Sequence, residues 1–308
     1  MTEAGDALKR ASAEDLFGLK GKGVLITGAS SLISVWIARL MQRVGAQVVL
    51  TDRLDEVAIR DAFRALADET GDEGLVLGGG IRLIGKVDLR NRTPGDVERT
   101  GRPLRSVREM VADAVDRLGA IDVLVNVAGG QEPLPAAALS TEAFRRTIDR
   151  ILLGTWNVIH EVFEQSMRDK GGRILTITAD VDQGYPMMPG MGAARAALSS
   201  LHRALAVEWA PMGITGCVIA PGATDTPGLR RYPEAARVRE VAKNASNLGR
   251  LLHAREVAWL FLTMASPWAA GVNGHTLVAN GGDSFVTPLF REMMSGGGTF
   301  RTGGDESD

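Results

Sequence analysis

The chain has 308 residues, of which 45% are hydrophobic and 23% charged, enough apolar material for the sizeable core of a globular protein. Its net charge of −2 excludes the strongly basic surface that would attract nucleic acid or an anionic membrane, so neither is an expected partner. One cysteine and four scattered histidines are too few for a metal cluster, and no metal is expected.

The composition also bears on where the protein resides. The first residues include acidic side chains and lack the apolar core of a signal peptide, and no apolar stretch approaches the length of a membrane span. Cys217 lies inside the apolar run Ile214–Ala220, as expected of a small buried residue in a reducing compartment. We therefore expect a cytoplasmic protein.

In chain order, short β-branched runs alternate with amphipathic helical stretches. The pattern predicts strands at Val24–Thr27, Val48–Thr51, Arg82–Val87, Val123–Val127, Arg173–Thr178, Ile214–Ala220 and His275–Val278. It predicts helices near Leu32–Val44, Asp55–Thr70, Leu104–Leu118, Thr141–Asp169, Gly192–Ala210 and Arg255–Ala265. Strands this apolar are buried on both faces, so the alternation predicts an α/β fold: a doubly wound parallel sheet of about seven strands with helices on both faces.

The organisation indicates a single domain over residues 18–285. Residues 1–17 are predicted to be an N-terminal extension, and residues 286–308 a glycine-rich C-terminal tail that is mobile at its end. The segment Asn91–Pro103 is too long and polar for a tight connection between neighbouring elements. It is expected to interrupt the regular alternation of strands and helices in the domain.

The first strand enters a helix through a turn of small residues, VLITGASSLIS over Val24–Ser34. Such a turn, here with Gly28 and Ser30, is where a dinucleotide pyrophosphate rests on helix N-terminal amides. Asp52 ends the second strand, at a distance that suits hydrogen bonds from an adenosine ribose. A carboxylate there also repels a 2′-phosphate, which favours NAD over NADP.

Further motifs follow the later strands: Asp88-Leu89, the stretch Asn126 to Gly129, Pro221-Gly222 and Thr226. Together with the first turn they resemble the short-chain dehydrogenase/reductase family over roughly residues 18–285, which implies a Rossmann-type fold. The resemblance implies an NAD(H) groove formed by Gly28, Ser30, Leu32, Asp52, Asp88, Leu89, Asn126, Ala128, Gly129, Arg195, Pro221, Gly222 and Thr226.

Two glycines of that family's TGxxxGxG turn are missing, because Leu32 and Ser34 stand in their places. The glycines let the backbone approach the pyrophosphate and let the helix pack closely on the strand. A leucine side chain at the turn would crowd the phosphates unless it rotates away. NAD(H) binding is therefore expected to be weakened or lost.

The family's four catalytic positions are also changed. Matching RILTITAD, MGAARAAL and DRILLGT to the family places Ala179 at its serine, Met191 at its tyrosine, Arg195 at its lysine and Ile151 at its asparagine. Alanine, methionine and isoleucine donate no proton, and an arginine stays protonated near neutrality. Ordinary alcohol–carbonyl dehydrogenation is therefore not expected.

One branch of the family dispenses with the tyrosine. The stretches AVEWAP and GLRR resemble the 2,4-dienoyl-CoA reductases, in which an acid elsewhere protonates carbon after hydride addition, although that branch keeps the glycine turn and the lysine. Asp180, Tyr185 and Arg195 are the candidate substitutes for the missing groups, with Asp182 close by. The alternatives are a solvated loop acid for Asp180, a lid residue for Tyr185 and, for His202, a helix-packing residue.

A set of arginines falls where this family covers its substrate: Arg230, Arg231, Arg237, Arg239 and Arg250. They would suit CoA phosphates or a substrate carboxylate. Glutamates are interspersed at Glu234, Glu240 and Glu256, so a solvated helical surface is the favoured interpretation.

Three functions stay open. The favoured one is a non-catalytic partner subunit, in a homo- or hetero-oligomer with relatives formed through helices such as Thr141–Asp169 and Gly192–Ala210, the usual dimer interface of the family. The second is an atypical NAD(H)-dependent reductase of conjugated enoyl substrates, with Asp180 as proton donor and an acyl-CoA-like ligand. The third is a non-redox lyase, isomerase or cyclase in the same pocket.

Overall fold

A computed structural model describes residues 16–70, 81–94, 104–130, 133–182, 184–230 and 234–285. Its centre is a seven-stranded, fully parallel sheet in the order β3-β2-β1-β4-β5-β6-β9. The strands are β1 (Gly23–Thr27), β2 (Gln47–Thr51), β3 (Ile81–Ile84), β4 (Val123–Asn126), β5 (Gly172–Ile177), β6 (Ile214–Pro221) and β9 (Thr276–Ala279). The doubly wound fold predicted from the sequence is confirmed.

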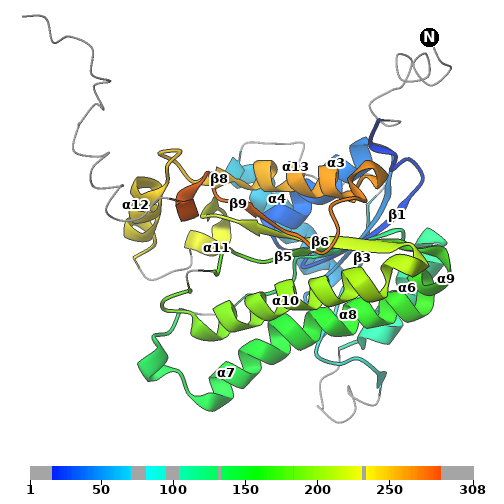
Figure 1. The fold of residues 1–308 in the computed structure, drawn as a ribbon, viewed down its shortest axis with the longest axis horizontal. Helices are drawn as coiled ribbons and strands as arrows, with labels where there is room; N and C mark the ends of the chain where they lie inside the picture. The colour runs from blue at the N-terminus through cyan, green and yellow to red at the C-terminus, as the bar shows by residue number, and fades with distance from the viewer. Residues whose placement is uncertain are drawn as a thin grey trace, which may run out of the picture.

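Helices cover both faces of the sheet (Figure 1). One face carries α3 (Leu32–Arg43), α4 (Glu56–Thr70) and α13 (Ala254–Ala265), and the other carries α6 (Val107–Leu118), α8 (Gly154–Val162) and α10 (Pro189–Glu208). Side chains alternate between the two layers, as the pleat of a strand requires: in β1, Ile26 belongs to the core under α3 and Leu25 to the core over α6. Two hydrophobic cores therefore hold the sheet.

The long helix predicted over residues 141–169 is a chain of helical segments. α7 (Thr141–Ile148) runs into the π-helical η3 (Asp149–Leu153), then α8, then the π-helical η4 (Phe163–Met167) and α9 (Arg168–Lys170). The helical run begins at Ser140, whose side chain accepts a hydrogen bond from the amide of Ala143, and ends at Gly171 with a φ of +71°. The π turns are single wide turns within an otherwise regular helix.

Three predicted boundaries are wrong by three residues, for local reasons. β3 ends at Ile84 rather than Val87, because Gly85 runs so close to Leu54 that a Cβ would lie 2.7 Å from the Leu54 oxygen. α6 begins at Val107 rather than Leu104, because Ser106 caps it. α10 begins at Pro189, three residues before the predicted start, since proline suits the first turn of a helix.

The remaining elements are short segments outside the seven-stranded sheet. They are η2 (Ala136–Ala138), η5 (Ala210–Met212), β7 (Thr224–Asp225), α11 (Pro227–Arg230), α12 (Ala235–Ala245), β8 (Leu252–His253), η6 (Pro267–Ala269) and η7 (Asp283–Phe285). β7 and β8 form a second small sheet. The predicted extension lies almost wholly outside the described residues, as do most of Asn91–Pro103 and the tail 286–308, so those predictions stand untested. Within the described parts, no helix combines the length and apolarity needed to cross a bilayer.

Candidate nucleotide groove and active site

A cavity of about 480 Å³ opens at the carboxyl ends of β1, β2 and β4, where the strand order reverses. Ligands of doubly wound sheets bind at this switch point, and the volume suits a small-molecule site. Its lining comprises Thr27, Gly28, Ser30, Ser31, Leu32, Thr51, Asp52, Arg53, Val87, Asp88, Leu89, Arg90, Val127, Ala128, Gly129, Gly130, Arg150, Thr226, Pro227 and Gly228.

The turn after β1 is built by close backbone approach. Gly28 has a φ of +80°, and a Cβ there would lie 2.8 Å from the amide nitrogen of Ala128. Its own amide donates to the Thr51 oxygen at 2.8 Å. Thr27 fixes the neighbouring strand end, because its Oγ1 accepts hydrogen bonds from the amides of Val127 and Ala128, both at 3.2 Å. Only glycine fits position 28, as a nucleotide turn requires.

The two substituted glycine positions turn their side chains mainly into the protein. Leu32 is 8% exposed and packs in the core under α3, so only its edge belongs to the cavity wall. The expected crowding of the phosphates by the whole side chain is therefore reduced to that edge. Ser34 is fully buried, and its Oγ has no hydrogen-bond partner among the described residues. An unsatisfied buried hydroxyl costs about 1–3 kcal/mol.

Both predicted acids reach the cavity, and both are already hydrogen-bonded. Asp52 Oδ2 accepts bonds from the amide and the Oγ of Ser30, each at 2.9 Å, so the end of β2 is bound to the turn after β1. Asp88 receives two bonds from one guanidinium, Arg90 Nε at 2.9 Å and Nη2 at 2.6 Å. A ligand hydroxyl would share these carboxylates with protein donors.

Three arginines of the cavity wall escaped the sequence reasoning: Arg53, Arg90 and Arg150. Arg53 directly follows Asp52, and Arg90 lies two residues after Asp88, so their nearness to predicted site acids is the signal that would have found them. Arg150 comes from the π-helical turn η3 and donates to the Gly130 oxygen at 3.0 Å. No sequence signal links it to the cavity.

The four family catalytic positions come together beside the end of β5. Ile151 and Met191 belong to one buried cluster, 3% and 6% exposed, which also contains Met188, Ala194 and Leu198. Arg195 donates through Nη1 to the backbone oxygen of Thr178, next to Ala179. None of the four belongs to the cavity lining within the described residues. Apolar packing therefore takes up the place where proton-transfer groups were sought.

The candidate substitutes also stand apart from the cavity. Asp180 is partly buried, and its Oδ2 accepts a hydrogen bond at 2.8 Å from Nδ2 of Asn280, just past β9. Tyr185 packs beside the apolar cluster. It also lies close to the start of α10, because a Cβ on Gly192 would be 3.1 Å from the Cβ of Tyr185. Asp182 is exposed on the same loop.

Most of the predicted cofactor residues converge on the cavity, and four do not. Those that line it are Gly28, Ser30, Leu32, Asp52, Asp88, Leu89, Ala128, Gly129 and Thr226; those that do not are Asn126, Arg195, Pro221 and Gly222. Gly222 has a packing role, because a Cβ there would lie 2.9 Å from Asn280 Cα.

Asn126 points into a buried polar chain. Its Nδ2 donates to Thr176 Oγ1 at 3.3 Å, and Thr176 Oγ1 lies 2.8 Å from Nε2 of His202. Burial lowers the pKa of His202 to about 4, so the ring is neutral near pH 7. A neutral imidazole has one donor and one acceptor nitrogen, and the Thr176 hydroxyl can pair with Nε2 in either role. His202 lies inside the protein, as the helix-packing interpretation predicts.

Three of the arginines near the predicted substrate cover are engaged in ion pairs. Arg239 holds Asp225 with both terminal nitrogens, Arg250 holds Glu256 at 2.7 Å, and Arg237 pairs with Glu234 at 3.1 Å. These pairs agree with the solvated-surface interpretation, while Arg231 lies outside the described residues. The described part of the chain holds no group of three or more His, Cys, Asp or Glu side chains placed for a metal ion.

Comparison with known proteins places the fold and the groove in a family. A family profile described as Enoyl-(Acyl carrier protein) reductase matches residues 28–284. The peroxisomal 2,4-dienoyl-CoA reductase of Rattus norvegicus is 34% identical over 88% of this chain and 86% of its own length. The structure of the citronellol catabolism dehydrogenase AtuB of Pseudomonas aeruginosa PAO1 is 30% identical, with a TM-score of 0.67 over 86% of this chain and 96% of its own.

A 3-ketoacyl-(acyl-carrier-protein) reductase of Brucella melitensis, solved in complex with NADH, is 25% identical, with a TM-score of 0.68 over 86% of this chain and 99% of that one. The resemblance to the dienoyl-CoA reductase branch drawn from AVEWAP and GLRR is confirmed by the rat relative. The chain belongs to the short-chain dehydrogenase/reductase family of oxidoreductases, close to the 2,4-dienoyl-CoA reductases.

Proposed function

We propose that this chain is a nucleotide-binding but non-catalytic member of its family that associates with an active relative as a partner subunit. The observation that carries the proposal is the buried packing of Ile151 against the cluster of Met191 and Met188. A family dehydrogenase needs a titratable group at that place, and general acid–base catalysis contributes about 10²- to 10⁴-fold in rate. An apolar cluster contributes none of it.

Arg195 does not replace the missing acid. Its guanidinium is directed to the Thr178 oxygen of its own chain, and an arginine stays protonated near neutrality and so exchanges no proton with a substrate. Its role in the proposal is structural: it joins the first half of α10 to the end of β5. A positive charge is kept at the lysine position, but the chemistry of the lysine is not.

The cavity residues fit a nicotinamide dinucleotide at its adenosine half. Gly28 leaves room that a Cβ would fill, and Asp52 presents a carboxylate to a ribose at the end of β2. When bound, the dinucleotide supplies or accepts a hydride. Leu32 at the turn and the Ser30 bonds to Asp52 compete with the ligand, so we propose weakened binding with a preference for NADH over NADPH.

The partner surface of the proposal is the outer side of α7, α8 and α10, where α7 and α8 follow one another in one helical run and α10 runs along that run below the sheet (Figure 1). Val207 near the end of α10 is 77% exposed, Leu153 in η3 is 46% exposed, and Phe144 on α7 is 37% exposed. Burial of such side chains against a second subunit releases apolar surface from water. The partner in this proposal is a copy of this chain or an active relative, and the location is the cytoplasm.

A second function is favoured by the likeness to the dienoyl-CoA reductases. In it the chain reduces a conjugated enoyl thioester with NADH, and Asp180 gives the proton to carbon. The Asn280 bond to Asp180 Oδ2 leaves Oδ1 for a proton in this scheme. The geometry argues against this second function, because Asp180 does not belong to the described lining of the cavity.

The experiment that tests the proposal is a calorimetric titration with NADH and with NADPH, followed by turnover of a 2,4-dienoyl-CoA. Binding of NADH without turnover supports the partner subunit. Turnover that disappears in Asp180→Asn establishes the reductase instead. No binding of either dinucleotide at millimolar concentration excludes the reductase and the nucleotide-binding part of the proposal, and co-purification with an active relative at fixed stoichiometry then tests the partner role alone.

A further inference from the structure

One face of helix α8 supports the loop that follows β3, residues 88–92. Gly154, Asn157 and Glu161 are spaced by three and four residues, so they lie on the same side of the helix. A Cβ on Gly154 would lie 3.3 Å from Leu89 Cβ, so the helix backbone runs directly against the loop. Asn157 Nδ2 donates to the Leu89 oxygen at 2.8 Å.

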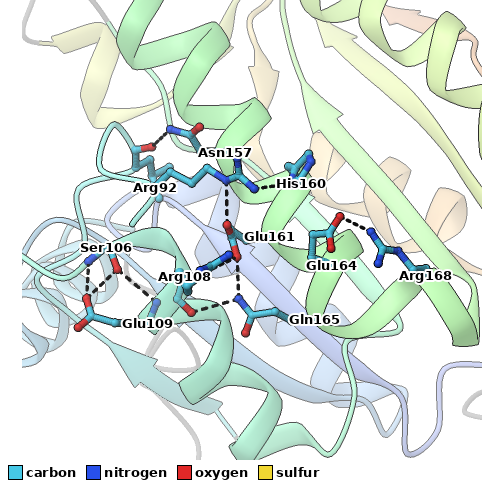
Figure 2. A network of polar contacts seen from close by, with 11 residues as sticks. Arg92, Ser106, Arg108, Glu109, Asn157, His160, Glu161, Glu164, Gln165 and Arg168 are labelled. Atoms are coloured by element: carbon cyan, nitrogen blue, oxygen red, sulfur yellow. Dashed lines mark hydrogen bonds and ion pairs between the residues drawn. The ribbon is translucent and has the colours of Figure 1, made fainter. Parts of the chain in front are cut away.

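The third residue of this face is a completely buried carboxylate. Figure 2 shows Glu161 between Arg92, Arg108 and Gln165, which donate to it at 2.8, 3.3 and 2.9 Å. Arg92 also contacts Nδ1 of His160 at 2.8 Å. Burial favours protonation, but these donors outweigh it and hold the pKa of Glu161 below its usual range, so the group stays charged.

Glu161 joins the two ends of the connection between β3 and α6. Arg92 lies in the first half of this connection, and Arg108 lies in the first turn of α6, just after it. The backbone is also hydrogen-bonded between the two ends, because the Val107 amide donates to the Asn91 oxygen at 2.7 Å and the Arg108 amide to the Arg92 oxygen at 2.9 Å. Removal of one partner from a buried ion pair is strongly destabilising, because it leaves a buried charge uncompensated. The loop is therefore fixed on its α8 side.

The other side of the same loop is cavity wall, through Asp88, Leu89 and Arg90. The strand order puts β3 next to β2 and β2 next to β1. A dinucleotide with its pyrophosphate at the β1 turn and its ribose at Asp52 therefore brings its purine to the end of β3, against this loop. The loop is a wall of the purine site, and α8 supports it from behind.

We infer that Asn157 and Glu161, which do not themselves line the cavity, are positioning residues for the purine half of a bound dinucleotide. The inference rests on the proposed nucleotide binding. Asn157 holds the backbone of Leu89 in place through its hydrogen bond to the Leu89 oxygen. Glu161 holds the end of the loop in place through its ion pair with Arg92. Both act through the loop backbone, so their loss is expected to weaken ligands that carry adenine and to leave ligands that lack it unaffected.

Calorimetric titrations of Asn157→Leu and Glu161→Gln with NADH, AMP and nicotinamide mononucleotide test this directly. AMP and NADH are expected to bind about tenfold more weakly to Asn157→Leu, the effect of one lost hydrogen bond to a carbonyl, and at least as much more weakly to Glu161→Gln, which removes the charge that pairs with two arginines. Binding of nicotinamide mononucleotide should not change in either variant. Glu164→Gln is the matched control, because Glu164 pairs with Arg168 on the following turn. Equal loss for AMP and nicotinamide mononucleotide, or no loss for AMP, overturns the inference.

Hydrogen exchange separates this inference from the proposed function. The amides of Arg90 and Asn91 are bonded within the loop, to Asp88 Oδ1 at 3.1 Å and to the Asp88 oxygen at 2.9 Å. Both variants are expected to speed their exchange at least tenfold, on the order of one lost hydrogen bond, while Glu164→Gln does not. If the unmodified protein binds no nucleotide, the proposed function fails and exchange alone decides the positioning role. Unchanged exchange in both variants refutes it.

Discussion

At the scale of single residues, the positions that define catalysis in this family differ from the positions that define its fold. Gly28 is kept because no Cβ fits against Ala128. Ile151 and Met191, the positions predicted to match the family's asparagine and tyrosine, are packed into an apolar cluster with their neighbours. The backbone around both sets is that of the family, which makes side-chain replacement a direct test.

The combined variant Ala179→Ser, Met191→Tyr and Arg195→Lys is expected to gain NADH-dependent reduction of a simple carbonyl. Restoring a proton donor is worth about 10²- to 10⁴-fold in rate, so the variant should exceed the unmodified protein by that order. Loss of the absorbance of reduced nicotinamide measures it, and Arg195→Lys alone is the control that should gain nothing. A folded variant that binds NADH and still lacks turnover means that the pocket has been remodelled beyond these side chains.

His202 predicts a pH dependence of stability. Its folded pKa of about 4 lies below its ordinary value of 6.5, so between those values the unfolded chain binds a proton that the folded chain does not. The free energy of unfolding is therefore expected to decrease as pH falls from about 6.5 to about 4, by about 3 kcal/mol in total from this residue. Urea unfolding at a series of pH values measures the change.

His202→Gln keeps a hydrogen-bonding group beside Thr176 but does not titrate. Between about pH 4 and 6.5 the slope of its unfolding free energy against pH should be smaller than that of the unmodified protein, because unfolding no longer takes up a proton at residue 202. Parallel curves would assign the acid sensitivity to other groups.

At the scale of elements, helix termini differ in how completely their backbone groups are satisfied. α6 has a full capping box: Ser106 Oγ accepts from the Glu109 amide at 3.4 Å, and Glu109 Oε2 accepts from the Ser106 amide at 2.9 Å. The Ser106 side chain is the largest cause of the lowered pKa of Glu109. α7 has a simpler cap, in which Ser140 Oγ accepts from the Ala143 amide at 3.2 Å.

Ser106→Ala is expected to lower the free energy of unfolding by about 1–2 kcal/mol, because it removes a buried cap and the hydrogen bond of its hydroxyl to Glu109. Ser140→Ala, at an exposed cap without a reciprocal glutamate, should cost about 0.5–1 kcal/mol. Denaturant midpoints of the two variants provide the comparison. A larger loss at Ser140 would show that burial and the second hydrogen bond of the box add little.

The elements that the sequence predicts are those with strong periodicity or with turn chemistry. All seven strands of the main sheet were predicted, because parallel strands buried on both faces read as continuous apolar runs. The small pair β7 and β8 and helix α12 were not, since two-residue strands have no period and α12 has no buried residue to mark a face. The π turns were missed because one extra residue in a helix leaves no compositional signal.

At the scale of the whole molecule, the two faces of the sheet carry different surfaces. The face with α7, α8 and α10 presents Val207 and Leu153, which belong to the proposed partner surface. The opposite face presents Val57, 69% exposed on α4, with no such role. The two valines are similar in exposure and in the kind of element that bears them, so they form a matched pair.

Val207→Asp is expected to convert an oligomer of this chain to a smaller species, because a charge in an apolar interface is costly to desolvate. Val57→Asp should leave the assembly unchanged. Analytical ultracentrifugation over a range of concentrations measures both. Dissociation by Val57→Asp alone would move the interface to the α4 face, and a monomeric unmodified protein would leave only the hetero-oligomer.

The sequence predicted the site residues that lie at strand ends and turns better than the side chains that tertiary packing brings to the cavity wall. Nine of the predicted cofactor residues line the cavity because they lie at strand ends and turns, whose places the sheet dictates. Arg150 was missed because its place depends on the packing of η3 beside the loop after β4, a contact between segments twenty residues apart. The inward packing of Leu32 likewise depends on the tertiary core.

The π-helical turn η3 has an evolutionary consequence. It carries Ile151, and such turns occur mostly at functional sites because they place one extra residue in a helix. A side chain changes by a single substitution, whereas removing the turn requires a deletion that rotates all of α8 by about 100°. Asn157 and Glu161 would then leave the loop after β3. The support of that loop thus keeps the backbone of η3 in place, and under the proposed non-catalytic function the chain stays only a few side-chain substitutions away from an active enzyme.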